Sequence, residues 1–281
     1  MKIIKKLYAS YIKWYDCNFS DFFECSIGDI ILQRDYPSSN QLLLTSRLLD
    51  VENYISGENL SFPHQNAISY KAYGAAHKEE RGNDHFRSLI ESYQNDGYHQ
   101  DSFVTCDNQL SLMDGNHRMG LHLFLGIDKV KVRIVRRKAK FNNGADWYYK
   151  VGLKSVFMEK LFQKYKNIQS FLIDSGNTFC AIIGNLTLSP GMSPLEDLKH
   201  LTTPLAIRTI NSEIDSRYRG GRILQFSLTN PQYIIENGNL VSSRIEEIRC
   251  ILQERYGEGA PIIISSNCLE GKALFQKFSE L

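Results

Sequence analysis

The sequence has no excess of basic residues that would attract a nucleic-acid backbone or an anionic membrane. Lysine and arginine total 33 against 31 acidic residues, and the net charge is +2. Binding to either partner would therefore depend on a local basic surface. On charge alone, nucleic acid is not an expected partner.

The sequence also lacks a long apolar run and a cysteine pattern. No stretch approaches the roughly 20 apolar residues of a membrane-spanning helix, and Ser10, Lys13 and Asp16 interrupt the segment that follows the basic N-terminus. The six cysteines include no C-x-x-C pair and no close Cys/His cluster, so neither a zinc site nor a disulfide framework is expected. These absences predict a cytoplasmic chain with reduced thiols and no membrane span.

What the sequence does contain is the composition of a packed protein, with 42% hydrophobic and 23% charged residues among 281. This length suits two ordinary domains. The basic run from Arg136 to Lys140, followed by Asn142-Asn143-Gly144, combines charge with turn residues and predicts a linker. The expected domains are therefore residues 1–140 and 141–281. Helical and strand patterns alternate in both, which predicts an α/β (α+β) fold class.

The pattern of apolar residues predicts the elements of both domains. Residues 42–49 fit either a buried strand or a short helix. A helix with one buried face is predicted to begin at Asn83 or Asp84 and to end at Gly97. The first domain continues with strands over 102–106 and 109–113, a helix over 116–125 and a strand over 130–134. The second is predicted to contain helices over 153–165, 195–201, 241–256 and 269–281, with strands over 178–188, 223–228 and 261–265.

The run Asp114-Gly115-Asn116-His117-Arg118 joins a predicted strand to a predicted helix. A helix start leaves backbone N–H groups unpaired and carries the positive end of the helix dipole, so it can hold an anion. Gly115 lets the backbone approach that anion, while His117 and Arg118 add donors. A purely structural turn, in which Asp114 caps the helix, is the alternative. The two strands that lead to the corner favour an anion site.

The same order of elements resembles the ParB/sulfiredoxin superfamily. A helix that ends in glycine leads to a strand pair, then to a G-x-x-R corner, which is Gly115 to Arg118 here, then to a helix and a strand. The resemblance covers about residues 42–137. It implies a ParB/sulfiredoxin-like N-terminal domain with a small mixed sheet, and a nucleotide phosphate bound at the corner. Residues 141–281 would form a second α/β domain of unassigned role.

Two branches of that superfamily fit this sequence poorly. Sulfiredoxins place a catalytic cysteine where this chain has Asn116, so sulfinic-acid repair is not expected. Chromosome-partitioning members carry a helix-turn-helix domain after the corner domain. Residues 141–281 show neither such a motif nor the matching charge, so DNA partitioning is not expected.

The pattern is closest to the free-serine-kinase-like branch, in which a glutamate ahead of the first helix is the base toward a substrate hydroxyl. His77-Lys78-Glu79-Glu80 stands where that branch has an H-E-E-like string. The resemblance implies a kinase that uses ATP or ADP with magnesium to phosphorylate a small hydroxylated metabolite or sugar. The implied catalytic residues are Glu80, Glu79, Asp114 and His117, and Asp114 is also the implied metal ligand. The implied phosphate-binding residues are Gly115, Asn116, His117 and Arg118, and His77 is a candidate for substrate binding. Tyr73 lies in an aromatic-rich segment that either covers a substrate or packs onto the core.

Other interpretations stay open at this point. Residues 78–81 also fit a charged surface loop, and His122 either shares the site or is structural. One competing function is a nucleic-acid-binding protein or nuclease, which would need a basic surface. The residues expected to form it are Arg133, Arg136, Arg137, Lys138 and Arg222. The other is a non-catalytic phosphate- or nucleotide-binding module. The sequence does not indicate an oligomeric state.

Overall fold

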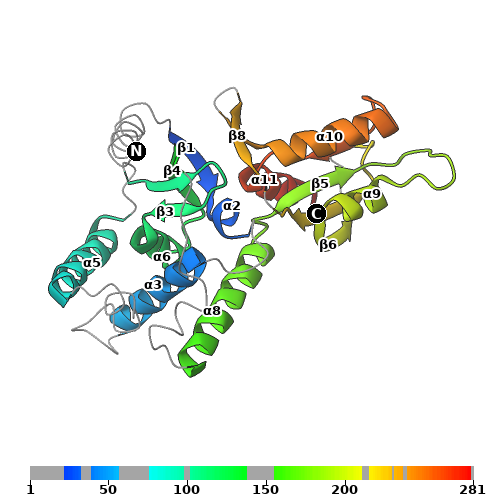
Figure 1. Cartoon of the computed structure of the whole chain (residues 1–281). Coiled ribbons are helices and arrows are strands. Elements are labelled where there is room, and N and C mark those ends of the chain that lie inside the picture. Colours follow the sequence, from blue (N-terminus) through cyan, green and yellow to red (C-terminus); the bar gives the residue numbers. More distant parts are fainter. Residues whose placement is uncertain are drawn as a thin grey trace. The chain divides into compact units, whose positions relative to one another are not determined.

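The computed structural model describes residues 22–32, 39–56, 76–97, 102–137, 155–210, 215–229, 231–236 and 239–279. The chain divides into two compact units (Figure 1). The first contains Met1–Glu24 and Tyr36–Ile168, and the second contains Cys25–Asp35 and Gln169–Leu281. The predicted division after residue 140 falls inside the first unit. Both units are discontinuous, because residues 36–168 of the first lie between the two segments of the second.

The first unit is built around a small mixed sheet. Its elements are β1 (Phe22–Ser26, which crosses into the second unit), α3 (Ser39–Ile55), α5 (Ala76–Asp96), β2 (Val104–Asp107), β3 (Leu112–Asp114), α6 (Asn116–Phe124), β4 (Lys129–Val135) and the first part of α8 (Ser155–Asp174). The strand order is β1-β4-β2-β3. Strand β2 pairs with β4 in parallel and with β3 in antiparallel orientation. The mixed α and β composition that the sequence predicts is confirmed.

Two predictions for the first unit are settled by its helices. Residues 42–49, which fitted a strand or a helix, belong to α3. The predicted start of the next helix at Asn83 or Asp84 is wrong, because α5 begins at Ala76. Alanine, lysine, glutamate and arginine dominate residues 76–81 and are among the best helix formers, which offsets the cost of about 1 kcal/mol for Gly82.

The core of the first unit lies between α3, α5 and α6. Buried side chains of the three helices form one apolar cluster: Val51, Phe86, Ile90, Tyr93 and Leu121. Helices α3 and α6 approach each other closely at Gly120, where an added Cβ would lie 3.0 Å from the Arg47 Cβ and 3.1 Å from the Leu48 backbone nitrogen. This packing fixes α6, the helix that begins at the predicted anion corner.

The second unit contains an antiparallel sheet with strand order β10-β5-β7-β6 and a separate hairpin. Its elements are α2 (Ile27–Ile31), the last part of α8, β5 (Phe179–Ile183), α9 (Pro194–Leu201), β6 (Thr203–Thr209), β7 (Arg222–Ser227), β8 (Tyr233–Glu236), β9 (Asn239–Ser242), α10 (Ser243–Tyr256), β10 (Ile262–Ile264) and α11 (Cys268–Ser279). The helices predicted over 195–201, 241–256 and 269–281 and the strands predicted over 223–228 and 261–265 are found, while the strand predicted over 178–188 ends at Ile183. The helix predicted over 153–165 is part of α8 and lies in the first unit. The sequence patterns missed β6, β8, β9 and α2.

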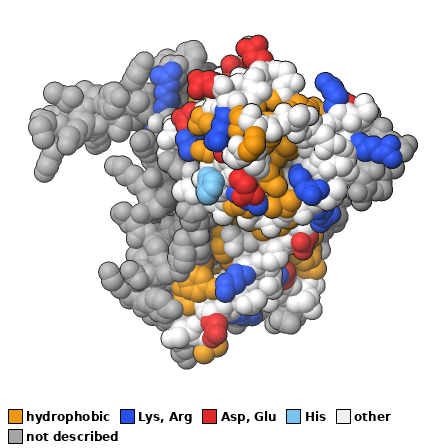
Figure 2. All heavy atoms as spheres, turned by 90° about the vertical axis from the view of Figure 1, so that its right-hand side faces the viewer, with side chains coloured by type: hydrophobic (Ala, Val, Ile, Leu, Met, Phe, Trp, Pro, Cys, Tyr) orange, Lys and Arg blue, Asp and Glu red, His pale blue; other side chains and the backbone are white. Residues whose placement is uncertain are grey.

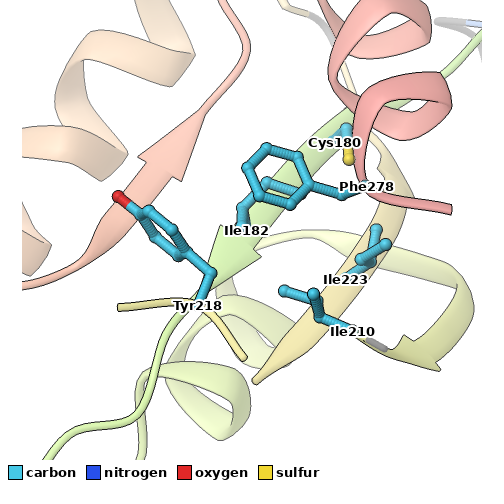
Figure 3. Packing of buried hydrophobic residues seen from close by; sticks show 6 residues of the cluster. All are labelled: Cys180, Ile182, Ile210, Tyr218, Ile223 and Phe278. Carbon is cyan, nitrogen blue, oxygen red and sulfur yellow. The ribbon is translucent and has the colours of Figure 1, made fainter. Parts of the chain in front are cut away.

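All five residues of β5 are buried, so this strand lies at the centre of the second unit. Figure 3 shows Cys180 and Ile182 of β5 beside Ile223 of β7 and Phe278 of α11. Helix α11 approaches β5 so closely that a Cβ at Gly271 would lie 2.0 Å from the Thr178 carbonyl oxygen. The sheet and this helix therefore share one core without space between their backbones.

The short helix α2 belongs to the second unit, although it comes early in the chain. Ser26 and Asp29 form a capping box, in which the Ser26 Oγ accepts from Gly28 N–H (3.0 Å) and the Asp29 Oδ2 accepts from Ser26 N–H (3.1 Å). The Asp29 Oδ1 accepts from the Tyr233 hydroxyl and from Cys268 N–H, both at 2.8 Å. Complete burial raises the pKa of Asp29. These bonds join residues more than 200 positions apart in the sequence.

Some large hydrophobic side chains of the second unit are exposed. Leu205 and Ile207 of β6 and Ile234 and Ile235 of β8 are each more than a third exposed. Figure 2 shows one face of the molecule, on which patches of hydrophobic side chains lie among lysine, arginine, aspartate and glutamate side chains. Within the described residues, no helix has the combination of length and hydrophobicity that a membrane crossing requires.

Candidate functional site

Gly115 forms the turn between β3 and α6, where the sequence predicts a strand-to-helix corner. Its φ of 103° and ψ of 17° place it in the left-handed region, and it is the N-cap of α6. A Cβ at this position would lie 2.6 Å from Val104 Cγ1. Glycine is therefore required by the backbone conformation and by the contact with β2.

Asp114 precedes the N-cap and has an exposed side chain. Its Oδ1 accepts a hydrogen bond from Gly115 N–H at 2.8 Å, and no side chain caps the helix from the N-cap position. Helical hydrogen bonding begins where Met119 N–H donates to the Gly115 carbonyl oxygen at 2.9 Å. The N–H groups of the first turn have no acceptor within the helix, which is the arrangement that can hold an anion.

Arg118 is held against the strand segment that leads into β2. Its Nη1 donates to the Phe103 carbonyl oxygen at 2.9 Å, and the side chain is half-buried. An arginine has five N–H donors in a planar fork, so this one bond does not exhaust them. The bond restricts the guanidinium to the β2 side of α6 and so lowers the entropy lost when it binds a ligand.

His117 connects the corner to helix α5. Its ring packs against the Phe86 ring with 4.5 Å between centroids and an interplanar angle of 52°. The corner and α5 are therefore adjacent, as a shared site would require. The implied residues His77, Glu79 and Glu80 lie in the first two turns of α5, but their side chains lie outside the described part of the structure. Tyr73 also lies outside the described residues.

Asn116 has a buried polar atom at the start of α6. Its Oδ1 is buried, and no described residue provides it with a hydrogen-bond partner. Buried polar atoms are nearly always hydrogen-bonded, and those that are not commonly belong to functional sites. A carbonyl oxygen accepts hydrogen bonds, so a ligand hydroxyl or a water bound to a ligand would satisfy it.

Replacing Asn116 with alanine separates a functional role from a structural one. We expect the free energy of unfolding to stay constant or to rise by about 0.5 to 1 kcal/mol, because alanine removes an unsatisfied acceptor and is the better helix former. Chemical denaturation of wild type and N116A measures this. A loss of more than about 1 kcal/mol would show that Asn116 holds the structure together through its side chain.

His122 lies inside the first unit and serves its packing. It is 1% exposed, and its Nε2 lies 3.2 Å from the Tyr93 hydroxyl, which donates to Ser102 Oγ. Burial, and then the charge of Arg118, lower the pKa of His122 to about 4. The ring is neutral at pH 7, so the structural interpretation of this histidine is supported over a cationic role at a phosphate.

The five cations proposed for a nucleic-acid surface do not share one unit. Arg222 lies on β7 of the second unit, where its Nη1 donates to Thr209 Oγ1 at 2.8 Å. Lys138 lies outside the described residues. Arg133 lies on β4 of the first unit with its guanidinium 4.9 Å from the centre of the Phe103 ring. Arg133 and Arg222 therefore belong to different units, and Arg133 contacts an aromatic ring that the sequence patterns did not indicate.

The described residues contain no group of three or more histidine, cysteine, aspartate or glutamate side chains arranged to hold a metal ion. Comparisons with protein-family models, curated proteins and solved structures find no match. The resemblance to the ParB/sulfiredoxin superfamily, and the roles that it implies, therefore stay predictions. The corner has to be interpreted from its own geometry.

Proposed function

We propose that the first unit binds a nucleoside phosphate at the corner from Gly115 to Arg118. We further propose that the chain is a kinase, which uses ATP or ADP to phosphorylate a small hydroxylated metabolite or sugar. The observation that carries the proposal is the left-handed Gly115 at the N-cap of α6, packed on Val104. Because glycine has no side chain, the N-cap residue leaves the N–H groups of the first helical turn accessible to a ligand.

The residues of the corner supply complementary groups for a nucleotide. The N–H groups of the first turn and the Arg118 guanidinium would bind phosphate oxygens. The buried Asn116 Oδ1 would accept a hydrogen bond from a hydroxyl or from a water that the nucleotide holds. His117, fixed by its contact with Phe86, would give a further donor. Arg118 is held by its bond to the Phe103 carbonyl oxygen, and His117 by its contact with Phe86.

Asp114 is the described residue suited to a magnesium ion at the corner. Magnesium in phosphotransferases is commonly held by one or two carboxylates together with the phosphates of the substrate. The Asp114 carboxylate is exposed and directly precedes the phosphate-binding turn. When bound, magnesium would neutralise the charge on the transferred phosphoryl group.

The base toward the acceptor hydroxyl would come from α5. Glu79 stands seven residues before Phe86, which is about two helical turns at roughly 3.6 residues per turn, and Phe86 contacts His117. Glu80 follows it in the sequence. A carboxylate in this helix would accept the hydroxyl proton as the oxygen attacks the terminal phosphorus, and the nucleotide would leave with the electron pair of the broken P–O bond.

The test begins with nucleotide binding. We expect ATP or ADP with magnesium to raise the thermal midpoint of the wild type, and R118A and R118K to weaken the affinity at least tenfold, because lysine keeps the charge but loses the planar fork. R208A, which removes an arginine from the second unit, is the matched control and should bind normally. If no nucleotide raises the midpoint, or if R118A binds as the wild type does, the corner is not a nucleotide site.

The test continues with phosphoryl transfer to a panel of sugars and hydroxylated amino acids. E79Q and E80Q are each compared with the wild type for turnover and for nucleotide affinity. We expect one of them to reduce turnover by 100-fold or more with little change in affinity, since a base acts on the acceptor and not on the nucleotide. Tight nucleotide binding without turnover on any acceptor would instead indicate a non-catalytic binding module.

A further inference from the structure

Strand β4 presents a row of cations on one face of the first unit's sheet. Lys129, Lys131 and Arg133 alternate with Val130 and Val132, which are 1% and 0% exposed. Side chains two positions apart in a strand point to the same face, at intervals of roughly 6.5 Å. The valines enter the core, so the three cations lie on the opposite face.

Two phenylalanines lie among these cations. The rings of Phe22 and Phe103 meet edge to face with 5.0 Å between centroids. The Lys131 Nζ lies 5.2 Å from the centre of the Phe22 ring, and the Arg133 guanidinium lies 4.9 Å from the centre of the Phe103 ring. Phe22 is 46% exposed, so part of its ring surface is accessible for stacking. Each of the two cations therefore lies against one ring of a phenylalanine pair.

The surface is hollowed next to the exposed ring. A hollow of about 540 Å³ lies between β1 and the start of β4. Its lining includes the Phe22 ring and the side chains of Lys129 and Lys131. It therefore combines an aromatic ring with two lysines and two carboxylates, and the lysines continue into the row of cations on β4.

The charge of this face is positive on balance. The acidic residues at the hollow are Glu24 and Asp128, and Glu24 forms an exposed ion pair with Lys129 (3.6 Å). Against them stand the three cations of β4, Lys129, Lys131 and Arg133. A polyanion would be attracted to this face in particular.

We propose that this face of the sheet, formed by Phe22, Phe103, Lys129, Lys131 and Arg133, binds single-stranded nucleic acid. Unpaired bases would stack on the exposed Phe22 ring and in the hollow, and the phosphates would follow the cations of β4. A duplex is disfavoured because its bases are already stacked on each other and do not reach a flat sheet. This inference does not rest on the proposed phosphotransferase.

The test measures the anisotropy of fluorescein-labelled 15-nucleotide oligo(dT) and oligo(U), with a 15-base-pair duplex and a poly-glutamate peptide for comparison. We expect the full chain to bind the single strands at least tenfold more tightly than the duplex or the peptide. F22A should weaken binding about fivefold or more, through lost stacking. R133A and K131A should weaken it and each reduce the slope of log affinity against log salt by about one.

The chain offers matched controls for both kinds of variant. Phe171 is an exposed phenylalanine of the second unit (57%), and Arg208 lies over the Phe275 ring at 4.8 Å, close to the geometry of Arg133 over Phe103. F171A and R208A should bind oligonucleotides as the wild type does. Thermal midpoints of all variants show which of them are folded, and K131A keeps the test independent of any loss of packing in F22A.

Three results would overturn the proposal. The first is an absence of oligonucleotide binding at low salt. The second is equal affinity for the duplex and the single strands together with equal losses in the test and control variants, which would indicate charge attraction without a site. The third is tighter binding of the poly-glutamate peptide than of either oligonucleotide, which would assign the face to an acidic protein partner.

Discussion

Gly271→Ala is expected to destabilise the second unit by about 3 kcal/mol or more. Alanine in a helix is ordinarily worth about 1 kcal/mol over glycine. Here the new Cβ would lie 2.0 Å from the Thr178 carbonyl oxygen, 3.1 Å from its carbonyl carbon and 3.2 Å from the Phe179 Cα. All three atoms belong to the backbone at the buried central strand β5, so none can rotate away. Helix α11 must move off the sheet, and the cost of that shift exceeds the gain in helix propensity.

Chemical denaturation of G271A and the wild type measures this loss. Gly259 provides the control, because nothing lies within 4 Å of a Cβ added there and its φ lies outside the left-handed region. G259A should be neutral or stabilising by up to about 1 kcal/mol, since alanine reduces the freedom of the unfolded chain. If G271A unfolds at the same denaturant concentration as G259A, the close contact between α11 and β5 does not exist in solution.

The second large effect is a loss of stability of the first unit in mild acid. Burial, with the charge of Arg118, lowers the pKa of His122 from 6.5 to about 4. Below pH 6.5, His122 therefore becomes protonated in the unfolded chain, whereas in the folded chain it stays neutral until about pH 4. Each pKa unit corresponds to about 1.4 kcal/mol, so the contribution is about 3 kcal/mol. This contribution to the free energy of unfolding is fully present above pH 6.5 and is lost as the pH falls to 4.

Urea denaturation at pH 7 and at pH 4.5, followed by circular dichroism, tests this sign and size. H122Q cannot take up the proton, so it should show a smaller difference between the two pH values than the wild type, by about 2 to 3 kcal/mol. H85Q, which changes an exposed histidine of the same unit, should behave as the wild type. Identical pH dependence in wild type and H122Q would mean that His122 titrates normally and is not desolvated.

Sequence patterns predicted the helices and strands that have a clear apolar periodicity or a capping residue. They failed for elements whose conformation depends on contacts with residues far away in the sequence. The spacing of Phe86, Ile90 and Tyr93 indicates a helix, and that helix buries these residues. Its start at Ala76 was missed because Asn83 is a good capping residue, yet the residues before it are strong helix formers. Strand β6 gives no alternation, since six of its seven residues are exposed and it is held by its pairing with β7.

The candidate site was predictable only where a local sequence pattern determines its conformation. An Asp-Gly turn before an apolar helix is a local signal, and Gly115 takes the left-handed conformation that it predicts. The bond from Arg118 to the Phe103 carbonyl oxygen joins residues 15 positions apart, and no short pattern encodes it. The Phe22 and Phe103 pair joins residues still further apart. The strand predicted over 130–134, which contains Arg133, was the part of that surface that the sequence indicated.

The placement of α2 in the second unit sets an order of events during synthesis on the ribosome. Asp29 is made early, but its partner Cys268 emerges 239 residues later. At roughly 5 to 20 residues per second, that interval lasts roughly 10 to 50 s, which is ample time for the first unit to fold between the two. Helix α2 can form its contacts with Tyr233 and Cys268 only after the last strands and α11 have left the exit tunnel, when the first unit is already folded. A gene fragment that begins after residue 140 would produce a second unit whose buried Tyr233 hydroxyl has lost its carboxylate.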